Sequence, residues 1–217
     1  RGNDLAKIHV GQTSMAVQGI GPRVTIKQRS GQPGRDAGSI RIRGIGTLGD
    51  SNPFILMDGV ETDINNIDPN DIESISILKD AASASIYGSR AASGVILITT
   101  KKAKAGQSHV EYSGKITTGF SAKPPPLLSA SEFRAYAQKT GIDISGIDHG
   151  GNTDWYKEIT QEGKISHEHY LAISGGTVKS NYRMSFDYLN NQGSIKQNFN
   201  ERLNALFSIN HKVLNDR

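Results

Sequence analysis

Two histidines that lie two residues apart come nearest to a metal site in this sequence. His167 and His169 would share one face of a strand, and an H-x-H pair on a strand can bind zinc. A zinc site needs at least one more protein ligand, and the sequence suggests no obvious third one. The pair is therefore more typical of solvated or pore-facing side chains, and we expect no metal.

A glycine-rich stretch is the next candidate for chemistry. Residues 44–49 read G-x-G-x-x-G and follow a predicted strand. Dinucleotide binding requires that a helix begin there, so that its amino terminus meets the pyrophosphate. Residues 50–53 read Asp-Ser-Asn-Pro instead, and another strand follows. The stretch therefore predicts a loop, and we expect no nucleotide cofactor.

An acidic stretch could suggest calcium. It contains Asp63, Asn65, Asp68 and Asp71. The spacing lacks the central glycine and the distal glutamate of an EF-hand. Turn and cap residues are the better interpretation of this stretch.

Other patterns of residues exclude whole classes of function. We find no Ser-His-Asp set, nucleophile elbow or H-E-x-x-H motif, so an enzyme is not expected. The absence of cysteine excludes disulfides and thiolate-bound metals. The net charge of +4 is small, the basic residues are spread out, and aromatic residues are few in the first half. Nucleic-acid binding therefore has no stacking platform.

The length and composition predict an ordered, turn-rich β protein. The chain has 217 residues and 24 glycines, enough for one large domain or two small ones. The longest apolar runs, such as residues 95–98, are far shorter than the roughly 20 residues of a membrane-spanning helix. The opening residues Arg-Gly-Asn-Asp do not read as a signal peptide.

The first half mixes short strands with short helices, which predicts a small α+β or α/β domain. Asp68 and Pro69 have the types that begin a helical turn. Asp80 is expected to cap a second helix over 81–87, which Gly88 would end. The expected strands cover residues 24–27, 39–43, 54–57, 74–78 and 95–101, the last in the centre of the sheet.

The second half alternates apolar and polar residues over long stretches. Four two-faced strands are expected, around residues 110–120, 170–174, 181–188 and 203–213. Residues 190–193 are expected to form a turn between two of them. Two helices, over 131–140 and 154–161, interrupt the series.

This alternation has two interpretations. A soluble β-sandwich has strands with one buried apolar face and one wet face. A transmembrane barrel has strands that alternate between a lipid-facing apolar side and a polar lumen. The pattern alone favours the sandwich, because the barrel signal of each strand is weak. Four strands cannot close a barrel, so the barrel interpretation requires a longer parent protein.

An ordered series of segments, however, resembles the SusC/RagA family of TonB-dependent outer-membrane transporters. In the first half the resemblance lies in residues 30–34, 39–44, 53–60 and 68–102. In the second half it lies in residues 127–133, 153–155, 173–177 and 181–183. It covers nearly the whole chain.

The resemblance implies an α+β plug domain over residues 1–104, built on a mixed sheet with short helices. Antiparallel strands from the start of a transmembrane β-barrel would follow over 105–217. Members of this family are several times longer and close a barrel of about 22 strands. We therefore expect a fragment that exposes the face of residues 182–188 and associates with itself through that face. The alternative is a soluble, secreted, β-rich ligand-binding module.

The function implied is import of oligosaccharides or peptides across the outer membrane of a Gram-negative bacterium. The plug would fill the barrel lumen, within reach of the periplasm, and gate the pore. A SusD-like surface lipoprotein and TonB would be the partners of the full-length protein, and no cofactor is implied.

Two sets of plug residues are expected to serve this function. Polar loops would face the substrate in the extracellular cavity. They contain Thr47, Leu48, Asp50, Ser51, Asn52, Asp63, Asn65 and Asn66. Charged residues could be ordinary surface pairs, but the resemblance favours ion pairs between plug and barrel. These are Arg41, Arg43, Asp58, Glu73, Asp80 and Arg90.

Overall fold

The computed structural model describes residues 8, 11–19, 24–42, 51–80, 85–104, 106–120 and 126–212. Several predictions concern other residues. The glycine-rich loop 44–49, Arg43, Thr47, Leu48, Asp50 and the expected helical residues 81–84 all lie outside the described ranges.

The described residues form three sheets. Strands β1 (Val24–Gln28) and β2 (Gly38–Ile42) form an antiparallel pair. The second sheet has the order β4-β3-β6-β5, with β3 (Phe54–Met57), β4 (Val60–Glu61), β5 (Ile72–Leu78) and β6 (Val95–Thr100). Because β3 and β6 are parallel and the other pairs antiparallel, this sheet is mixed, as predicted.

These two sheets share one hydrophobic core. Ile40 and Ile42 of β2 point inward, and Ile96 and Ile98 of the central strand β6 meet them. Each fully buried side chain of this size contributes roughly 1.5–3 kcal/mol. The short helix α2 (Thr13–Ala16) closes the core with Ala16. We call residues 11–104, as far as they are described, the N-terminal lobe.

Short 3-10 helices connect the strands of the lobe. They are η1 (Ile64–Asn66), η2 (Pro69–Asp71), η3 (Ser85–Tyr87) and η4 (Ser89–Ser93). Asp68 begins η2 as predicted, since its side chain accepts a hydrogen bond from the backbone of Asn70. The second predicted helix is different. Its described part is only η3, and Gly88 (φ 72°, ψ −160°) does not adopt the left-handed helical conformation.

The third sheet, which we call the long-stranded sheet, is antiparallel with the order β10-β9-β8-β7. Its strands are β7 (His109–Thr118), β8 (Ile165–Gly176), β9 (Ser180–Gln192) and β10 (Phe199–His211). All four were predicted. The turn predicted at 190–193 was misplaced, because Asn190, Asn191 and Gln192 still pair with β10, and residues 193–198 make the connection.

The two predicted helices both lie in the connection between β7 and β8. They are α4 (Ala130–Thr140) and α5 (Trp155–Ile159). Ser129 and Glu132 form a capping box, and Gly141 ends α4 with φ 71°. Within the described ranges, no helix is long and apolar enough to cross a membrane.

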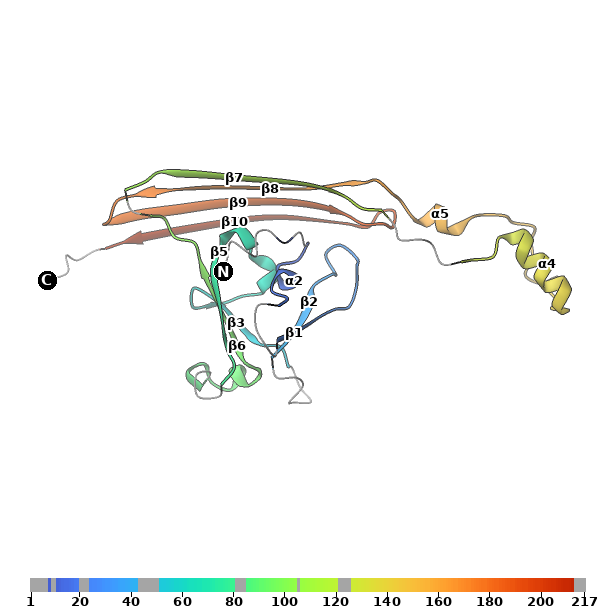
Figure 1. The fold of residues 1–217 in the computed structure, drawn as a ribbon, viewed down its shortest axis with the longest axis horizontal. Coiled ribbons are helices and arrows are strands. Elements are labelled where there is room, and N and C mark those ends of the chain that lie inside the picture. The colour runs from blue at the N-terminus through green and yellow to red at the C-terminus, as the bar shows by residue number, and fades with distance from the viewer. Residues whose placement is uncertain are drawn as a thin grey trace.

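The N-terminal lobe lies against one face of the long-stranded sheet, while α4 and α5 extend beyond one end of its strands (Figure 1). The covered face is the polar one. In β9 the buried residues include Arg183, Ser185 and Asp187, whereas Tyr182 and Phe186 are exposed. In β10 the side chain of Leu203 is 75% exposed.

This arrangement is the reverse of a soluble sandwich, which buries its apolar faces. The sandwich favoured by the alternation alone is therefore wrong for this sheet. A sheet that covers its polar face and leaves its apolar face open has the orientation of a barrel wall, polar toward the lumen and apolar toward lipid.

Candidate functional site

The interface between the N-terminal lobe and the long-stranded sheet is built on two buried aspartates of the lobe, Asp68 and Asp71. Asp68 caps the short helix η2 and Asp71 is its last residue, so the chain presents both carboxylates from a single turn. Pro69 and the cap formed by Asp68 fix the conformation of this turn. Both aspartates therefore meet the sheet in a fixed position.

Asp71 is hydrogen-bonded to two strands of the sheet. Its Oδ1 accepts from the Tyr170 hydroxyl of β8 at 2.6 Å, and its Oδ2 accepts from the Ser185 hydroxyl of β9 at 2.8 Å. Arg183 Nη2 donates to the same Tyr170 hydroxyl at 2.7 Å and lies 3.8 Å from Asp71 Oδ1. The carboxylate thus has two donors and a nearby cation, which offset much of the cost of burying its charge.

Asp68 faces a second set of polar side chains in the sheet. Arg202 Nη2 of β10 lies 3.2 Å from Asp187 Oδ1 and 3.7 Å from Asp68 Oδ2. Arg202 Nη1 also donates to the backbone carbonyl of Asn65 in the lobe at 3.3 Å. Arg202 therefore connects the lobe with β9.

The electrostatics around Asp68 are unusual. Burial raises the pKa of Asp68 to about 7. The charge of the neighbouring Asp187 also raises this pKa, whereas the hydrogen bond from the Asn70 backbone lowers it. Glu168 of β8 also approaches, so that oxygens of these three carboxylates all lie within 4.8 Å of one another. Lys115 pairs with Glu168 at 3.0 Å. Lys115 and Arg202 together already supply two positive charges to this group of carboxylates. The set is therefore poorly suited to a divalent cation.

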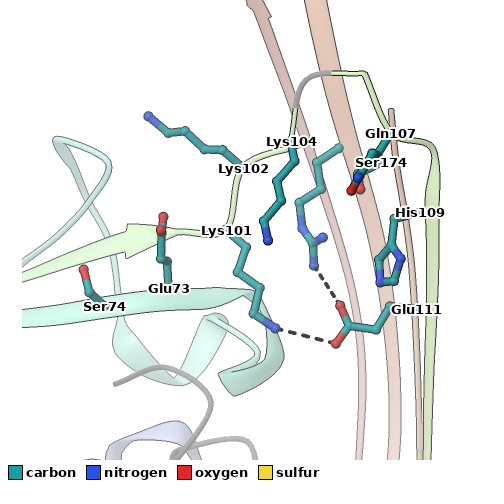
Figure 2. A pocket seen from close by; sticks show the side chains of 10 residues that line it. Glu73, Ser74, Lys101, Lys102, Lys104, Gln107, His109, Glu111 and Ser174 are labelled. Atoms are coloured by element: carbon teal, nitrogen blue, oxygen red, sulfur yellow. Dashed lines mark ion pairs between the residues drawn. The ribbon is translucent and has the colours of Figure 1, made fainter. Parts of the chain in front are cut away.

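A hollow of about 830 Å³ lies beside Arg183, between the end of the lobe and the sheet (Figure 2). Lys101 of the lobe and Glu111 of β7 point toward one another across it, 3.6 Å apart. Arg183 lies 3.6 Å from the other oxygen of Glu111. The hollow is also lined by Glu73, Ser74, Lys102, Lys104, Gln107, His109 and Ser174. The interface thus combines buried contacts with a polar hollow.

Comparisons with known proteins match both halves. A family model described as the TonB-dependent Receptor Plug Domain matches residues 1–95. The TonB-dependent receptor SusC of Bacteroides thetaiotaomicron is 36% identical over 220 residues, which cover 89% of this chain and 22% of that protein. The TonB-dependent receptor P26 of Formosa agariphila is 37% identical over 202 residues, which cover 86% of this chain and 20% of that protein.

The chain belongs to the SusC/RagA family of TonB-dependent receptors. It spans about a fifth of the length of the curated relatives that it matches. The plug model covers most of its N-terminal lobe, and the match to the RagAB importer extends over the long-stranded sheet as well.

Solved structures agree with this assignment. The RagAB peptide importer in the "closed-closed" state has a TM-score of 0.82 at 25% identity, covering 98% of this chain and 28% of that one. The "open-open" state has a TM-score of 0.79 at the same identity, covering 99% of this chain and 28% of that one. The siderophore receptor PirA of Acinetobacter baumannii shares the fold, with a TM-score of 0.52 at 24% identity. The match covers 87% of this chain and 24% of the PirA chain. The soluble alternative finds no support.

Three of the charged residues predicted to join plug and barrel bond within the plug. Arg90 pairs with Glu61 at 2.6 Å, and its guanidinium lies over the Phe54 ring. Arg41 donates to Asn52, and Asp58 accepts from the backbone and hydroxyl of Thr100. Glu73 lines the hollow of Figure 2, and Asp80 follows β5. Contacts of these residues with further barrel strands stay a prediction.

Three of the predicted substrate-facing residues share one hollow of about 550 Å³ on the plug. Asn52, Asp63 and Asn65 line it together with Glu61 and Thr62. Ser51 is buried, and Asn66 is exposed in η1. That these residues meet substrate stays a prediction.

His167 and His169 share one face of β8, as predicted, with ring centroids 5.3 Å apart. That face is not the pore-facing one. Their rings lie against Tyr112 and Tyr188, and the Tyr112 hydroxyl is 2.8 Å from His169 Nδ1. Tyr112 is exposed on the side away from the plug, so a pore-facing position for the pair was wrong.

The contacts that do join plug and barrel were missed in the sequence. Asp68 and Asp71 were interpreted only as cap and turn residues, and Arg183 and Asp187 only as the polar half of an alternation. A charged residue at the centre of a two-faced strand is the signal that could have indicated them, because such a charge needs a partner in the lumen.

Proposed function

We propose that this chain is the plug and the first four barrel strands of a TonB-dependent receptor that imports oligosaccharides or peptides across the outer membrane of a Gram-negative bacterium. Residues 1–104 are the plug and residues 105–217 the start of the barrel. The observation that carries the proposal is the packing of the plug on the polar face of a sheet whose apolar face is open.

The lengths of the connections suggest how the sheet lies in the membrane. Outer-membrane barrels have short periplasmic turns and longer extracellular loops. Only residues 177–179 join β8 to β9, whereas residues 119–164 join β7 to β8. The end with residues 177–179 is then periplasmic, and α4 and α5 are extracellular. The hollow of Figure 2, which includes His109 at the start of β7, lies near the periplasmic end.

The polar interface suits a gate better than an apolar one would. Opening must separate plug from barrel at a modest cost in free energy. A ligand can shift the equilibrium between the closed and open states only by the difference between its affinities for them. Contacts such as those of Asp71 can be replaced by water when the interface opens, which an apolar core cannot do. The hollow beside Arg183 gives water a place to enter.

The names of the relatives support the proposed cargo and partners. The RagAB structures are described as a peptide importer, and SusC as a TonB-dependent receptor. A SusD-like lipoprotein on the extracellular side and TonB on the periplasmic side are the partners of the full-length receptor. Substrate would meet the plug at the hollow lined by Asn52, Asp63 and Asn65. The chain has no catalytic role.

Uptake by the bacterium that carries the gene tests this function. Cells that lack the receptor gene are compared with cells complemented by the wild-type gene, using labelled oligosaccharides and labelled peptides in parallel. We expect the deletion to abolish uptake of one of these classes, and loss of TonB to have the same effect. Unchanged uptake of both classes in the deletion strain would contradict the proposal.

A further inference from the structure

We propose that Asp68 of the plug and Asp187 of the barrel sheet bind one proton between them, and that this shared proton holds plug and barrel together in the closed state. The inference concerns the closed interface and not the cargo. It rests on the proposed function only in that the plug leaves the sheet during opening.

The first argument is the geometry of the two carboxylates. Each residue is only 2% exposed, and each has an oxygen, Oδ2, without a hydrogen-bond partner. Oxygens of Asp68, Asp187 and Glu168 lie within 4.8 Å of one another. Two buried carboxylates this close cannot both be ionised without a large cost, whereas one proton between them removes the repulsion.

The second argument is that the remaining oxygens are already used. Asp68 Oδ1 accepts from the backbone N–H of Asn70 at 2.6 Å. Asp187 Oδ1 accepts from Arg202 Nε and Nη2, each at 3.2 Å, and from Asn204 Nδ2 at 3.3 Å. The two unpartnered Oδ2 atoms are therefore where a proton is needed, since a buried acceptor without a donor costs about 1–3 kcal/mol.

The third argument is the balance of charge around the pair. Three carboxylates meet here, from the plug, β8 and β9, and two cations face them, Lys115 from β7 and Arg202 from β10. Asp71, three residues after Asp68 in the plug, is bonded to Tyr170 and Ser185 instead. Three negative and two positive charges leave one negative charge. One proton neutralises it, while a divalent cation would leave an excess positive charge.

The consequence is a dependence of docking on pH. The pKa of Asp68 is about 7 in the closed state, against 3.8 for an ordinary aspartate, so the closed state binds the proton more tightly than separated parts do. The contribution of the pair is fully present below pH 3.8 and is lost as pH rises through 7. With one proton involved, the docking equilibrium should weaken roughly tenfold between pH 6 and pH 8.

Infrared spectroscopy tests for the proton itself. The full-length receptor in lipid should show the carbonyl band of a protonated carboxylic acid at pH 6, and this band should disappear toward pH 8. Asp68→Asn should remove it. Asp63→Asn is the matched control, because Asp63 caps η1 as Asp68 caps η2 and lies on the exposed surface of the plug. A band that survives in both Asp68→Asn and Asp187→Asn contradicts the proposal.

Release of the plug tests the effect on docking. The separated fraction is measured with spin labels on plug and sheet under mild denaturant, between pH 6 and pH 8. We expect a pH dependence in wild type and Asp63→Asn, and a flat response in Asp68→Asn and Asp187→Asn. The same dependence in all four proteins, or none in wild type, overturns the inference.

Addition of calcium chloride at pH 8 tests for a metal in place of the proton. If it tightens docking of the plug in wild type but not in Asp68→Asn, the site takes a metal instead. Neither experiment depends on uptake, so failure of the inference and failure of the proposed function can be told apart.

Discussion

The phenol of Tyr170 donates a hydrogen bond to the carboxylate of Asp71 at 2.6 Å, and this bond joins the long-stranded sheet to the plug. Tyr170 is the largest side chain among the fully buried residues of the described ranges. Its hydroxyl also accepts from Arg183, so that one phenol links a plug acid with a barrel cation. The interface therefore depends on a few buried polar groups.

Loss of the Asp71 carboxylate should weaken this interface strongly. Asp71→Ala would leave Arg183 with only the partly exposed Glu111 as counter-charge and remove the acceptor of Tyr170 and Ser185. Breaking a buried pair in this way costs about 3–5 kcal/mol. Denaturant titration of plug release in the full-length receptor measures it. Glu61→Ala is the control, because its exposed pair with Arg90 is worth at most about 1 kcal/mol. Equal effects of both variants would contradict the role of Asp71.

Removal of the Tyr170 hydroxyl alone should have a smaller effect. Tyr170→Phe keeps the ring packed but leaves Asp71 Oδ1 without its donor and Arg183 without its acceptor. The expected cost is about 1–3 kcal/mol. In a double-mutant cycle, Tyr170→Phe should cost much less when Asp71→Ala is already present. Additive effects would mean that the two groups do not interact.

The two faces of β10 should respond oppositely to charge. Phe207 is exposed on the apolar face, and Ser208 is its neighbour on the polar face. Phe207→Lys should destabilise the folded barrel by about 2 kcal/mol, because it places an ammonium group in lipid. Ser208→Lys should be tolerated. Urea unfolding of the full-length receptor in lipid vesicles compares them, and an equally tolerated Phe207→Lys would argue against a lipid-facing surface.

The short turn between β8 and β9 depends on Gly176. This residue has φ 125°, and a Cβ atom there would lie 2.3 Å from the backbone oxygen of Ser180. Gly176→Ala should therefore cost at least about 2 kcal/mol. Gly163 also has a positive φ but open space around it, so Gly163→Ala should cost only about 1 kcal/mol. Thermal unfolding of the full-length receptor gives the difference, and a Gly176→Ala variant as stable as Gly163→Ala would be unexpected.

The loop after α4 should be held by one ion pair. Two nitrogens of Arg134 donate hydrogen bonds to the Asp148 carboxylate, at 2.7 and 2.9 Å. These two bonds, and a further one from the Gly150 N–H, lower the pKa of Asp148 to about 2. The lowered pKa means that the contact persists above pH 3.8 and is lost as pH falls toward 2. Hydrogen exchange, corrected for intrinsic rates, should show faster exchange over residues 141–151 in Asp148→Ala. Asp143→Ala, which loses only its bond to Ser145, should act locally.

Much of the fold could be predicted from the sequence because its signals are local. Alternation located β7 to β10, and the residue type at Asp68 indicated where η2 begins. The helix predicted over 131–140 is α4, which begins one residue earlier. The expected helix over 81–87 rested on small residues that tolerate a helix without requiring one, and its described part is a single 3-10 turn.

The candidate site could not be predicted from local signals. Alternation shows that β9 has two faces but not which one is covered, because that depends on whether the surroundings are water or lipid. The types of Asp68 and Asp71 account for one cap and one turn, and these roles gave no reason to seek a second partner. Their partners in β8, β9 and β10 become neighbours only in the folded chain.

The covered polar face of β10 can be tested most directly with spin labels in the full-length receptor in a lipid bilayer. Labels are placed one at a time at Leu203, Asn204, Ala205, Leu206, Phe207 and Ser208, and their collision rates with oxygen and with a water-soluble nickel chelate are measured. We predict that oxygen accessibility is high at Leu203, Ala205 and Phe207 and low at Asn204, Leu206 and Ser208. The opposite alternation, or high accessibility to the nickel chelate at Leu203 and Phe207, would contradict a sheet that faces lipid with one side and the plug with the other.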